Sequence, residues 1–338
     1  MAIQSSELKY YKPASVNDTG TNGGRMSANE IVSAVKNNIF PDVSQAERAN
    51  GTSRHRKVFF KVSSADNLAL QNARIFLEQS TAGGDRIVMF PATQTGTQSA
   101  ITGAERKYGV GQLQSGAAVG DSSVVVTVES GDDAVFQDGD LIRVSNQANV
   151  NDSTGKEEWI RLASTGGVAW NGDQATLTFA SGQVLANPYL ASNTRVSSVI
   201  EAGTVEPTVT GWTETTASGT YDETLHPVIP DAIGAIREVW TLTFTSPTNY
   251  SVVGAVIGAV GTGSIGGGTF APDNPDFTGH PYFELADSGW GGTWQAGDSL
   301  TFTTTPAAYP VWFKHIVPAG TDSSSVSNFV FAMSGESA

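Results

Sequence analysis

Four histidines and no cysteine limit the chemistry that this 338-residue chain can perform. The histidines are His55, His226, His280 and His315. None stands in a His-Glu-x-x-His motif, which would place two zinc ligands on one turn of a helix. The Gly-x-Ser-x-Gly turn of serine hydrolases and the Gly-Lys-Ser/Thr phosphate loop are also missing. We expect no catalytic residue, no metal and no cofactor, although a carboxylate pair is defined by its separation in space and stays open.

One glycine pattern imitates a nucleotide-binding fingerprint. Residues 261–266 read Gly-Thr-Gly-Ser-Ile-Gly after an apolar segment. A dinucleotide site needs a helix directly after these glycines, because the helix amides bind the pyrophosphate. Here Gly267, Gly268, Pro272 and Pro275 follow instead. The pattern therefore predicts a flexible hairpin loop.

Acidic residues gather in two places where they could supply oxygen ligands to Ca²⁺. They are Asp132, Asp133, Asp138 and Asp140 in the first place, and Asp273 and Asp276 in the second. The spacing does not match an EF-hand, and aspartate before glycine is also ordinary turn chemistry. We favour turns and leave calcium as the alternative.

A basic cluster and a group of tryptophans are the candidate contact sites. Arg54, Arg56 and Lys57 adjoin two phenylalanines, which would suit phosphate contacts, a solvated strand edge or an interface to an acidic neighbouring protein. We favour the strand edge or the interface over nucleic acid, because the chain as a whole is acidic. Trp290, Trp294 and Trp312 could stack against sugar rings if they are exposed, whereas tryptophans in β domains more often anchor a core.

Composition and charge divide the chain. The net charge is −14, from 19 basic and 33 acidic residues, yet residues 1–107 hold 13 basic and 9 acidic ones. All seven tryptophans lie after this part. Such asymmetry indicates that the two parts face different surroundings. No apolar run is long enough to span a membrane, and no secretory signal is visible, so we expect synthesis and retention in a cytoplasm.

The expected fold is mainly β, with a small N-terminal α+β unit and an extended arm, followed by sandwich- or barrel-like modules. Capping boxes predict helices over 27–40 and 44–51, and β-branched and aromatic runs predict strands over 57–62, 74–77 and 86–90. Later strands are expected over 123–129, 141–145, 158–162, 175–179, 238–244, 250–256, 299–304, 310–316 and 327–333. The domains expected are an arm (1–25), a docking unit (26–110), a β module (111–190), a connection (191–235) and a second β module (236–338).

Residues 136–144 and 294–302 echo each other. Each has an aromatic residue, a Gly-Asp turn and an alternating strand. The echo indicates either two related modules or turn chemistry that arose twice.

Several segments resemble one family over most of the chain. They are residues 8–13, 22–27, 36–48 and 56–61 in the first part, and 238–244, 274–277 and 290–298 near the C-terminus. Together they are similar to virion structural proteins of tailed bacteriophages and prophages. The resemblance implies a particle component in the neck, tail, baseplate or capsid surface.

From the arm and the resemblance we expect a non-enzymatic, multi-copy virion subunit. The arm has no core of its own, so Leu8, Tyr10 and Tyr11 should be buried on a neighbour, beside contacts from the basic cluster. Partners would be copies of the chain and other virion proteins, with no membrane or nucleic acid. The alternatives are a capsid decoration protein, a tail module that binds a host glycan or receptor, and an enzyme that degrades host envelope.

Overall fold

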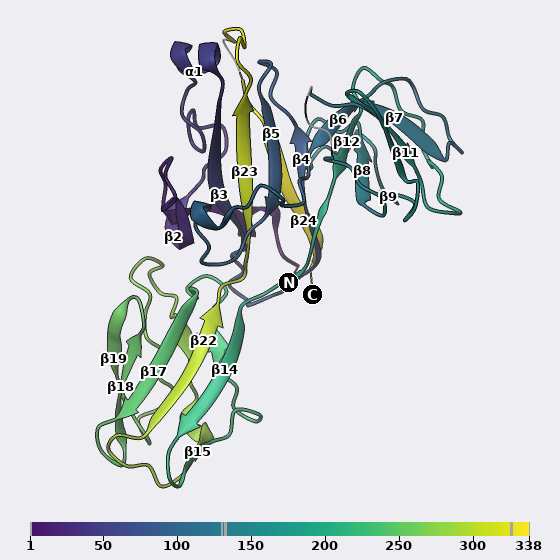
Figure 1. Cartoon of the computed structure of the whole chain (residues 1–338). Helices are drawn as coiled ribbons and strands as arrows, with labels where there is room; N and C mark the ends of the chain where they lie inside the picture. Colours follow the sequence, from purple (N-terminus) through teal and green to yellow (C-terminus); the bar gives the residue numbers. More distant parts are fainter. Residues whose placement is uncertain (1, 130, 132–133, 325–326, 338) are drawn as a thin grey trace.

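The computed structural model describes residues 2–129, 131, 134–324 and 327–337. Strands make up 47% of the chain and helices 5%, in several antiparallel sheets of which none closes into a barrel. The mainly β fold expected from the sequence is confirmed. Figure 1 shows three bodies: a central body that contains both chain ends, and two β units attached to it.

The central body holds two sheets. The five-stranded sheet has the order β2-β1-β3-β23-β5, and the three-stranded sheet has the order β13-β4-β24. Their bounds are β1 (Leu8–Ser15), β2 (Gly23–Glu30), β3 (Thr52–Val62), β4 (Leu70–Gln79), β5 (Arg86–Pro91), β13 (Ile200–Val205), β23 (Ala308–Val317) and β24 (Val330–Ser337). Helix α1 (Gln45–Asn50) and the 3₁₀ turns Ser5–Glu7 and Gln98–Ala100 complete the body.

The core of the central body lies between these two sheets. Val58, Phe60 and Val62 of β3 and Phe76 of β4 are fully buried in it. β3 is buried on its other face as well, since Phe59, Lys57 and Lys61 are also shielded from solvent. A strand covered on both faces needs polar groups that find partners inside the protein.

The middle unit is one seven-stranded sheet with the order β10-β11-β7-β6-β12-β8-β9. Its strands are β6 (Val110–Leu113), β7 (Ser123–Thr127), β8 (Leu141–Ser145), β9 (Glu157–Arg161), β10 (Val168–Asn171), β11 (Gln174–Thr178) and β12 (Arg195–Ser198). The sheet curls, because Leu162 just after β9 forms an isolated bridge with Phe179 just after β11. Its core is mostly aliphatic, as in Val126, Ile142 and Leu177.

The C-terminal unit packs a five-stranded sheet, order β14-β22-β17-β18-β19, against two short ribbons, β15-β21 and β16-β20. The bounds are β14 (Thr208–Thr215), β15 (Gly219–Tyr221), β16 (Ile229–Pro230), β17 (Glu238–Phe244), β18 (Asn249–Gly254), β19 (Gly258–Ser264), β20 (Phe283–Glu284), β21 (Trp290–Gly292) and β22 (Ser299–Thr305), with a 3₁₀ turn at Asp287–Gly289. Its core is aromatic, with Trp240, Phe244, Tyr250 and Trp294 fully buried.

The chain passes through the central body three times, which corrects the expected domains. β23 lies between β3 and β5, and β24 pairs with β4, so residues 308–337 belong to the central body and not to a module spanning 236–338. The expected connection at 191–235 contains β12 to β16. Both β units are thus insertions into a body built from residues 1–109, 199–207 and 306–338.

The helix predicted for residues 27–40 is wrong. Gly23 to Glu30 form β2, paired with β1, and irregular turns follow. Ala34 and Asn37 take positive φ angles of 62° and 58°, which no right-handed helix contains. Pairing with β1 overrides the capping pattern at Ser27, whose hydroxyl donates to the Lys12 carbonyl instead. The first unit is therefore β with one short helix.

The second capping box behaves as predicted. The Ser44 hydroxyl accepts a hydrogen bond from the Glu47 amide, and the Glu47 carboxylate accepts one from the Ser44 amide. Helix α1 then ends at Gly51, whose φ of 77° favours glycine. Each predicted strand is also present, with shifts of a few residues at its ends.

The two echoed segments form the same turn. In each, the aspartate accepts a 2.8 Å hydrogen bond from the amide three residues earlier, Asp140 from Gln137 and Asp298 from Gln295. The glycine between them has positive φ, 80° at Gly139 and 96° at Gly297. The strand orders around β8 and β22 differ, so the likeness is local.

Candidate functional site

The arm residues are buried within their own chain. β1 pairs with β3 along residues Leu8 to Tyr11. Tyr10 packs edge-on against Phe60 and Phe331, with ring centres 5.2 and 5.0 Å apart, and burial raises its pKa to about 12. Tyr11 is only 4% exposed. The expectation that Leu8, Tyr10 and Tyr11 are buried on a neighbour is wrong, because β3 already supplies the partner strand.

The basic cluster is neutralised internally. Arg56 forms an ion pair with Asp18 at 2.6 Å, and Arg54 contacts Glu47. The Lys57 ammonium donates to the carbonyl oxygens of Gly24, Gln94 and Gly96 at 2.6, 3.2 and 3.0 Å. Burial lowers the pKa of Lys57 to about 7. The expected contact of Arg54, Arg56 and Lys57 with an acidic neighbour is therefore wrong: these groups hold β3, the 17–24 turn and the 94–96 loop together.

Two of the three tryptophans proposed to stack on sugars are also buried. Trp294 is 1% exposed and stacks on Phe244 with ring centres 4.4 Å apart. Trp312 of β23 is 4% exposed. A β-carbon at Gly23, whose φ is 109°, would lie 2.8 Å from the Trp312 ring, so glycine is required there. Trp290 is partly exposed and meets Tyr221 and Trp294 edge-on. Sugar stacking by Trp294 and Trp312 is wrong, because their rings fill cores, whereas stacking by Trp290 stays a prediction.

The acidic turns have structural roles where they are described. Asp138 accepts from the Gly166 and Val168 amides, and Asp140 contacts Arg106. The Asp276 amide donates to Asn274 in the second acidic turn, which also contains Asp273. Among the described residues no cluster of three or more metal-ligating side chains occurs. Asp132 and Asp133 lie outside those residues.

The glycine pattern at 261–266 spans the end of β19 and the turn after it, and no helix follows. The predicted hairpin loop is therefore misplaced, because residues 261–264 are strand and the loop of the β18–β19 hairpin lies at 255–257. In addition, no helix among the described residues is long and apolar enough to cross a membrane.

Charged side chains that the sequence did not single out lie where the central body meets the C-terminal unit. We call this contact the C-terminal seam. The Lys61 ammonium donates to the Ile233 carbonyl and lies 4.4 Å from the centre of the Phe277 ring. Burial lowers the pKa of Lys61 to about 7. Arg25 of β2 pairs with the buried Glu238 of β17 at 3.0 Å. The lysines among the apolar residues of β3 were the feature of the sequence that could have indicated these buried charges.

The seam to the middle unit uses a different set of charges. Arg143 of β8 is buried and lies 2.7 Å from Glu157 and 3.6 Å from Glu78 of β4. Arg161 of β9 forms a two-pronged ion pair with Glu201 of β13, with both bonds at 2.7 Å, and this pair is largely exposed. Both insertions are thus fixed to the central body by ion pairs at their bases.

A groove of about 920 Å³ lies on the central body beside the irregular segment 31–43. On its floor His315 Nε2 lies 2.6 Å from an Asp85 carboxylate oxygen, and Ser327 donates to the same carboxylate at 3.1 Å. Burial alone would raise the pKa of Asp85, but the hydrogen bonds from His315, Ser327 and Thr81 bring it below its usual value. In a nucleophilic triad the histidine would bond the serine. Here both bond the aspartate.

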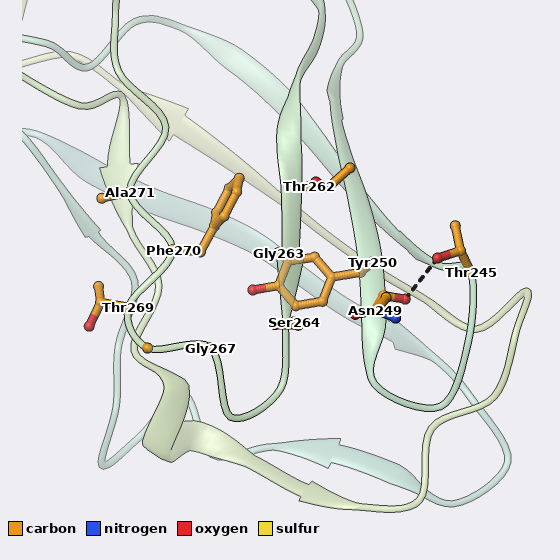
Figure 2. A pocket seen from close by; sticks show the side chains of 11 residues that line it. Thr245, Asn249, Tyr250, Thr262, Gly263, Ser264, Gly267, Thr269, Phe270 and Ala271 are labelled. Atoms are coloured by element: carbon orange, nitrogen blue, oxygen red, sulfur yellow. Dashed lines mark hydrogen bonds between the residues drawn. The ribbon is translucent and has the colours of Figure 1, made fainter.

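A second hollow of about 510 Å³ lies in the C-terminal unit between the β18–β19 hairpin and the loop at 265–271. Figure 2 shows the Tyr250 ring across the strand at Gly263, and the Phe270 ring meets it edge-on with ring centres 5.8 Å apart. None of the lining residues carries a charge. The hollow offers hydroxyl and amide groups beside one partly exposed aromatic ring, Phe270.

The outward face of the five-stranded sheet is a regular surface of small side chains. Buried side chains alternate with outward ones along β17, β18 and β22, so paired residues share a face. The face, which we call the threonine face, consists of Thr208, Thr210, Thr213, Thr215, Val239, Thr241, Thr243, Ser251, Val253, Ala259, Thr262, Ser299, Thr301, Thr303 and Thr305.

The threonine face carries no carboxylate. Glu214 and Glu238, the charged residues within these five strands, point to the other side, where Glu214 accepts from Trp212 Nε1 and the Tyr221 amide. Arg237 reaches one end of the face, where it donates to the Thr305 hydroxyl at 3.2 Å. Every residue of the face is exposed or half-exposed. Alternation of threonine in the sequence was the signal for this surface.

Comparisons with known proteins do not relate the chain to a family or a known fold. No protein family model matches the chain, and no curated protein matches it. Among solved structures, the crystal structure of infectious bursal disease virus VP2 subviral particle aligns over 88% of this chain and 80% of that chain, with 12% identity and a TM-score of 0.10. A TM-score of 0.10 is too low to relate the two folds.

Proposed function

We propose that the chain is a non-enzymatic structural subunit of a tailed-phage particle, present in many copies in the neck, tail or baseplate. The observation that supports this most is the division of charge among the three bodies. The central body holds 14 basic and 13 acidic residues, net +1, whereas the middle unit holds 4 and 10, net −6, and the C-terminal unit 1 and 10, net −9.

This division suits a subunit with one docked side. Acidic units of adjacent copies repel each other and remain in solvent, while a near-neutral body can pack against its neighbours without a large electrostatic cost. The resemblance of residues 8–13, 22–27 and 36–48 to phage virion proteins points the same way. Because β1 is part of the central sheet, docking would use the surface of the whole central body and not a free arm.

Quantitative mass spectrometry of purified particles from the phage or induced prophage that encodes the chain tests this function. We expect a fixed, multi-copy stoichiometry relative to the major capsid protein. Particles that lack the chain would overturn the proposal. Electron cryomicroscopy of the same particles would then distinguish a neck, tail or baseplate position from a capsid decoration protein.

A glycan-binding module is a second candidate, favoured by the uncharged hollow in Figure 2. Neutral sugars are bound by an aromatic ring together with hydroxyl and amide groups. Host polysaccharide titrated into the purified chain should bind, and Phe270→Ala should weaken binding while Trp290→Phe should not. Equal affinity of wild type and Phe270→Ala would exclude this hollow as the site.

A further inference from the structure

We propose that residues 31–36, which we call the strap, can close onto the free edge of β24 and add a fourth strand to the sheet β13-β4-β24. This inference goes beyond the proposed virion role and does not depend on it. It concerns the groove of about 920 Å³, which is lined by the strap and by residues 327–331. Closure would fill part of this groove with chain that is already tethered beside it.

The smaller sheet of the central body leaves room for one more strand. Five strands form one layer of the body and three form the other, in which β24 is an edge strand. Among the residues that the structure describes, β24 pairs with β4 alone, and no backbone hydrogen bond reaches residues 328–332 from any other segment. Phe331 packs on Tyr10 of β1 and Phe60 of β3, so this end of β24 lies over those two strands. An unpaired strand edge is a template for a further strand.

The strap has the composition of a strand but not its conformation. Its sequence, Ile-Val-Ser-Ala-Val-Lys, contains three β-branched aliphatic residues, which favour strands. It forms irregular turns instead, and Val32 and Val35 are 57% and 54% exposed. Ala34 has a φ of 62°, in the left-handed region that is unfavourable for a residue with a β-carbon. An extended strand would remove this strain and turn Val35 to the same side as Ile31, which is already buried.

Few contacts hold the strap in its irregular form. Lys36 pairs with Asp42 at 2.9 Å, but both side chains are largely exposed, so the pair adds little stability. The side-chain amide of Asn38 donates to the Val32 carbonyl. Both contacts lie within residues 31–43 and do not tie the strap to either sheet. A segment with few buried contacts rearranges at low cost in free energy.

Two fixed points set the direction of the added strand. The Ile31 amide donates to the Tyr10 carbonyl at 2.7 Å, and the Tyr10 hydroxyl is hydrogen-bonded to the backbone of Met333. Further along the chain, Phe40 packs against Phe329 with ring centres 6.1 Å apart. The strap therefore begins beside Met333 and leads toward Phe329. In the closed form it would run antiparallel to β24.

The lack of cysteine makes a direct test possible. Continuing the antiparallel register places Lys36 opposite Asn328, and both residues are exposed. Lys36→Cys combined with Asn328→Cys should form an intramolecular disulfide, which needs Cα atoms about 4.4–6.8 Å apart. Lys36→Cys combined with Gln79→Cys is the matched control, because Gln79 lies on β4, one strand beyond β24. The control pair should form its disulfide about tenfold more slowly.

Variants of Ala34 distinguish strand closure from a chance encounter of the two thiols. In the Lys36→Cys, Asn328→Cys background, Ala34→Val disfavours the irregular form, because a β-branched residue rarely adopts a positive φ. It should raise the rate of disulfide formation by about fivefold. Ala34→Gly removes the strain from the irregular form and should lower the rate by about fivefold.

Non-reducing electrophoresis and peptide mass spectrometry identify the disulfide that forms. Equal rates for the three residues at position 34, or a control pair that reacts as fast as the first pair, would overturn the proposal. A disulfide that joins two chains would also overturn it, since the free edge of β24 would then take its strand from a second copy. None of these results depends on whether the chain is found in particles.

Discussion

The two inserted units solve the same packing problem in opposite ways. The middle unit buries small aliphatic side chains such as Val126 and Val144, and its seven strands curl around them. The C-terminal unit buries large rings such as Trp240 and Phe302 against a five-stranded sheet. Both sheets turn their other side to solvent, since β7 and β11 alternate buried and outward side chains as β17 and β22 do. The two units therefore differ in what fills the core, small aliphatic groups or rings of about 150–250 Å² each, and not in whether a sheet face is exposed.

Replacing a large buried side chain by alanine in each core is the strongest test of this comparison. Trp240 is fully buried, and its Nε1 donates to the Thr304 hydroxyl at 2.8 Å. Trp240→Ala should lower the free energy of unfolding of the C-terminal unit by about 3–5 kcal/mol, and Leu177→Ala that of the middle unit by about 2–5 kcal/mol. Hydrogen exchange resolved by segment should locate each loss in its own unit. Loss of protection in both units from either variant would show that they share one cooperative core.

The buried lysine at the C-terminal seam should make the stability of the chain depend on pH. The pKa of Lys61 is about 7 in the fold, whereas an unfolded lysine titrates near 10.5. Between these values the unfolded chain binds more protons, so stability should rise with pH from 7 to 9, by up to about 1.4 kcal/mol per pH unit for this residue. Urea unfolding at several pH values measures the slope.

The Lys61→Met variant should show a shallower slope than wild type over the same range. Lys36→Met, at an exposed position beside Asp42 and away from Lys61, is the control and should leave the slope unchanged. Equal slopes for wild type and Lys61→Met would mean that Lys61 keeps an ordinary pKa in the fold.

The ion pairs at the two seams should also differ in how much they stabilise the fold. Arg25→Met leaves the carboxylate of Glu238 buried without its cation, which should cost about 1–3 kcal/mol. Arg161→Gln breaks an exposed pair with Glu201 and should cost at most about 1 kcal/mol. Thermal unfolding of both variants tests the order. A larger loss of stability from Arg161→Gln than from Arg25→Met would mean that the ion pair to the middle unit is the stronger of the two.

Local sequence rules predicted half of the described strands and one helix, because alternation and capping depend on neighbouring residues. β8 and β17 begin and end where predicted, and α1 follows its capping box. The helix over 27–40 failed because strand pairing with β1, fixed by distant residues, overrode local preference. The placement of β23 between β3 and β5 is likewise decided by pairing across the whole chain.

The prediction that certain residues contact a partner was wrong for a related reason. Exposure cannot be read from residue type, and the same tyrosines, lysines and tryptophans that could bind a partner also fill a core. Tyr11, Lys57 and Trp294 all lie inside. The threonine face was not identified, although its alternation was visible in residues 299–305, because no rule assigns a partner to an uncharged strand face.

The pairing of β3 with β23 has a consequence for synthesis. Lys61 is made early and its neighbour Ala308 late, with both inserted units between them. The middle and C-terminal units have their own cores, so each can fold as it leaves the ribosome. The central sheet must wait for almost the entire chain, and β3, which pairs with β1 on one edge, lacks β23 on its other edge until then. A translation pause or truncation before residue 308 should therefore yield two folded units on an aggregation-prone stem.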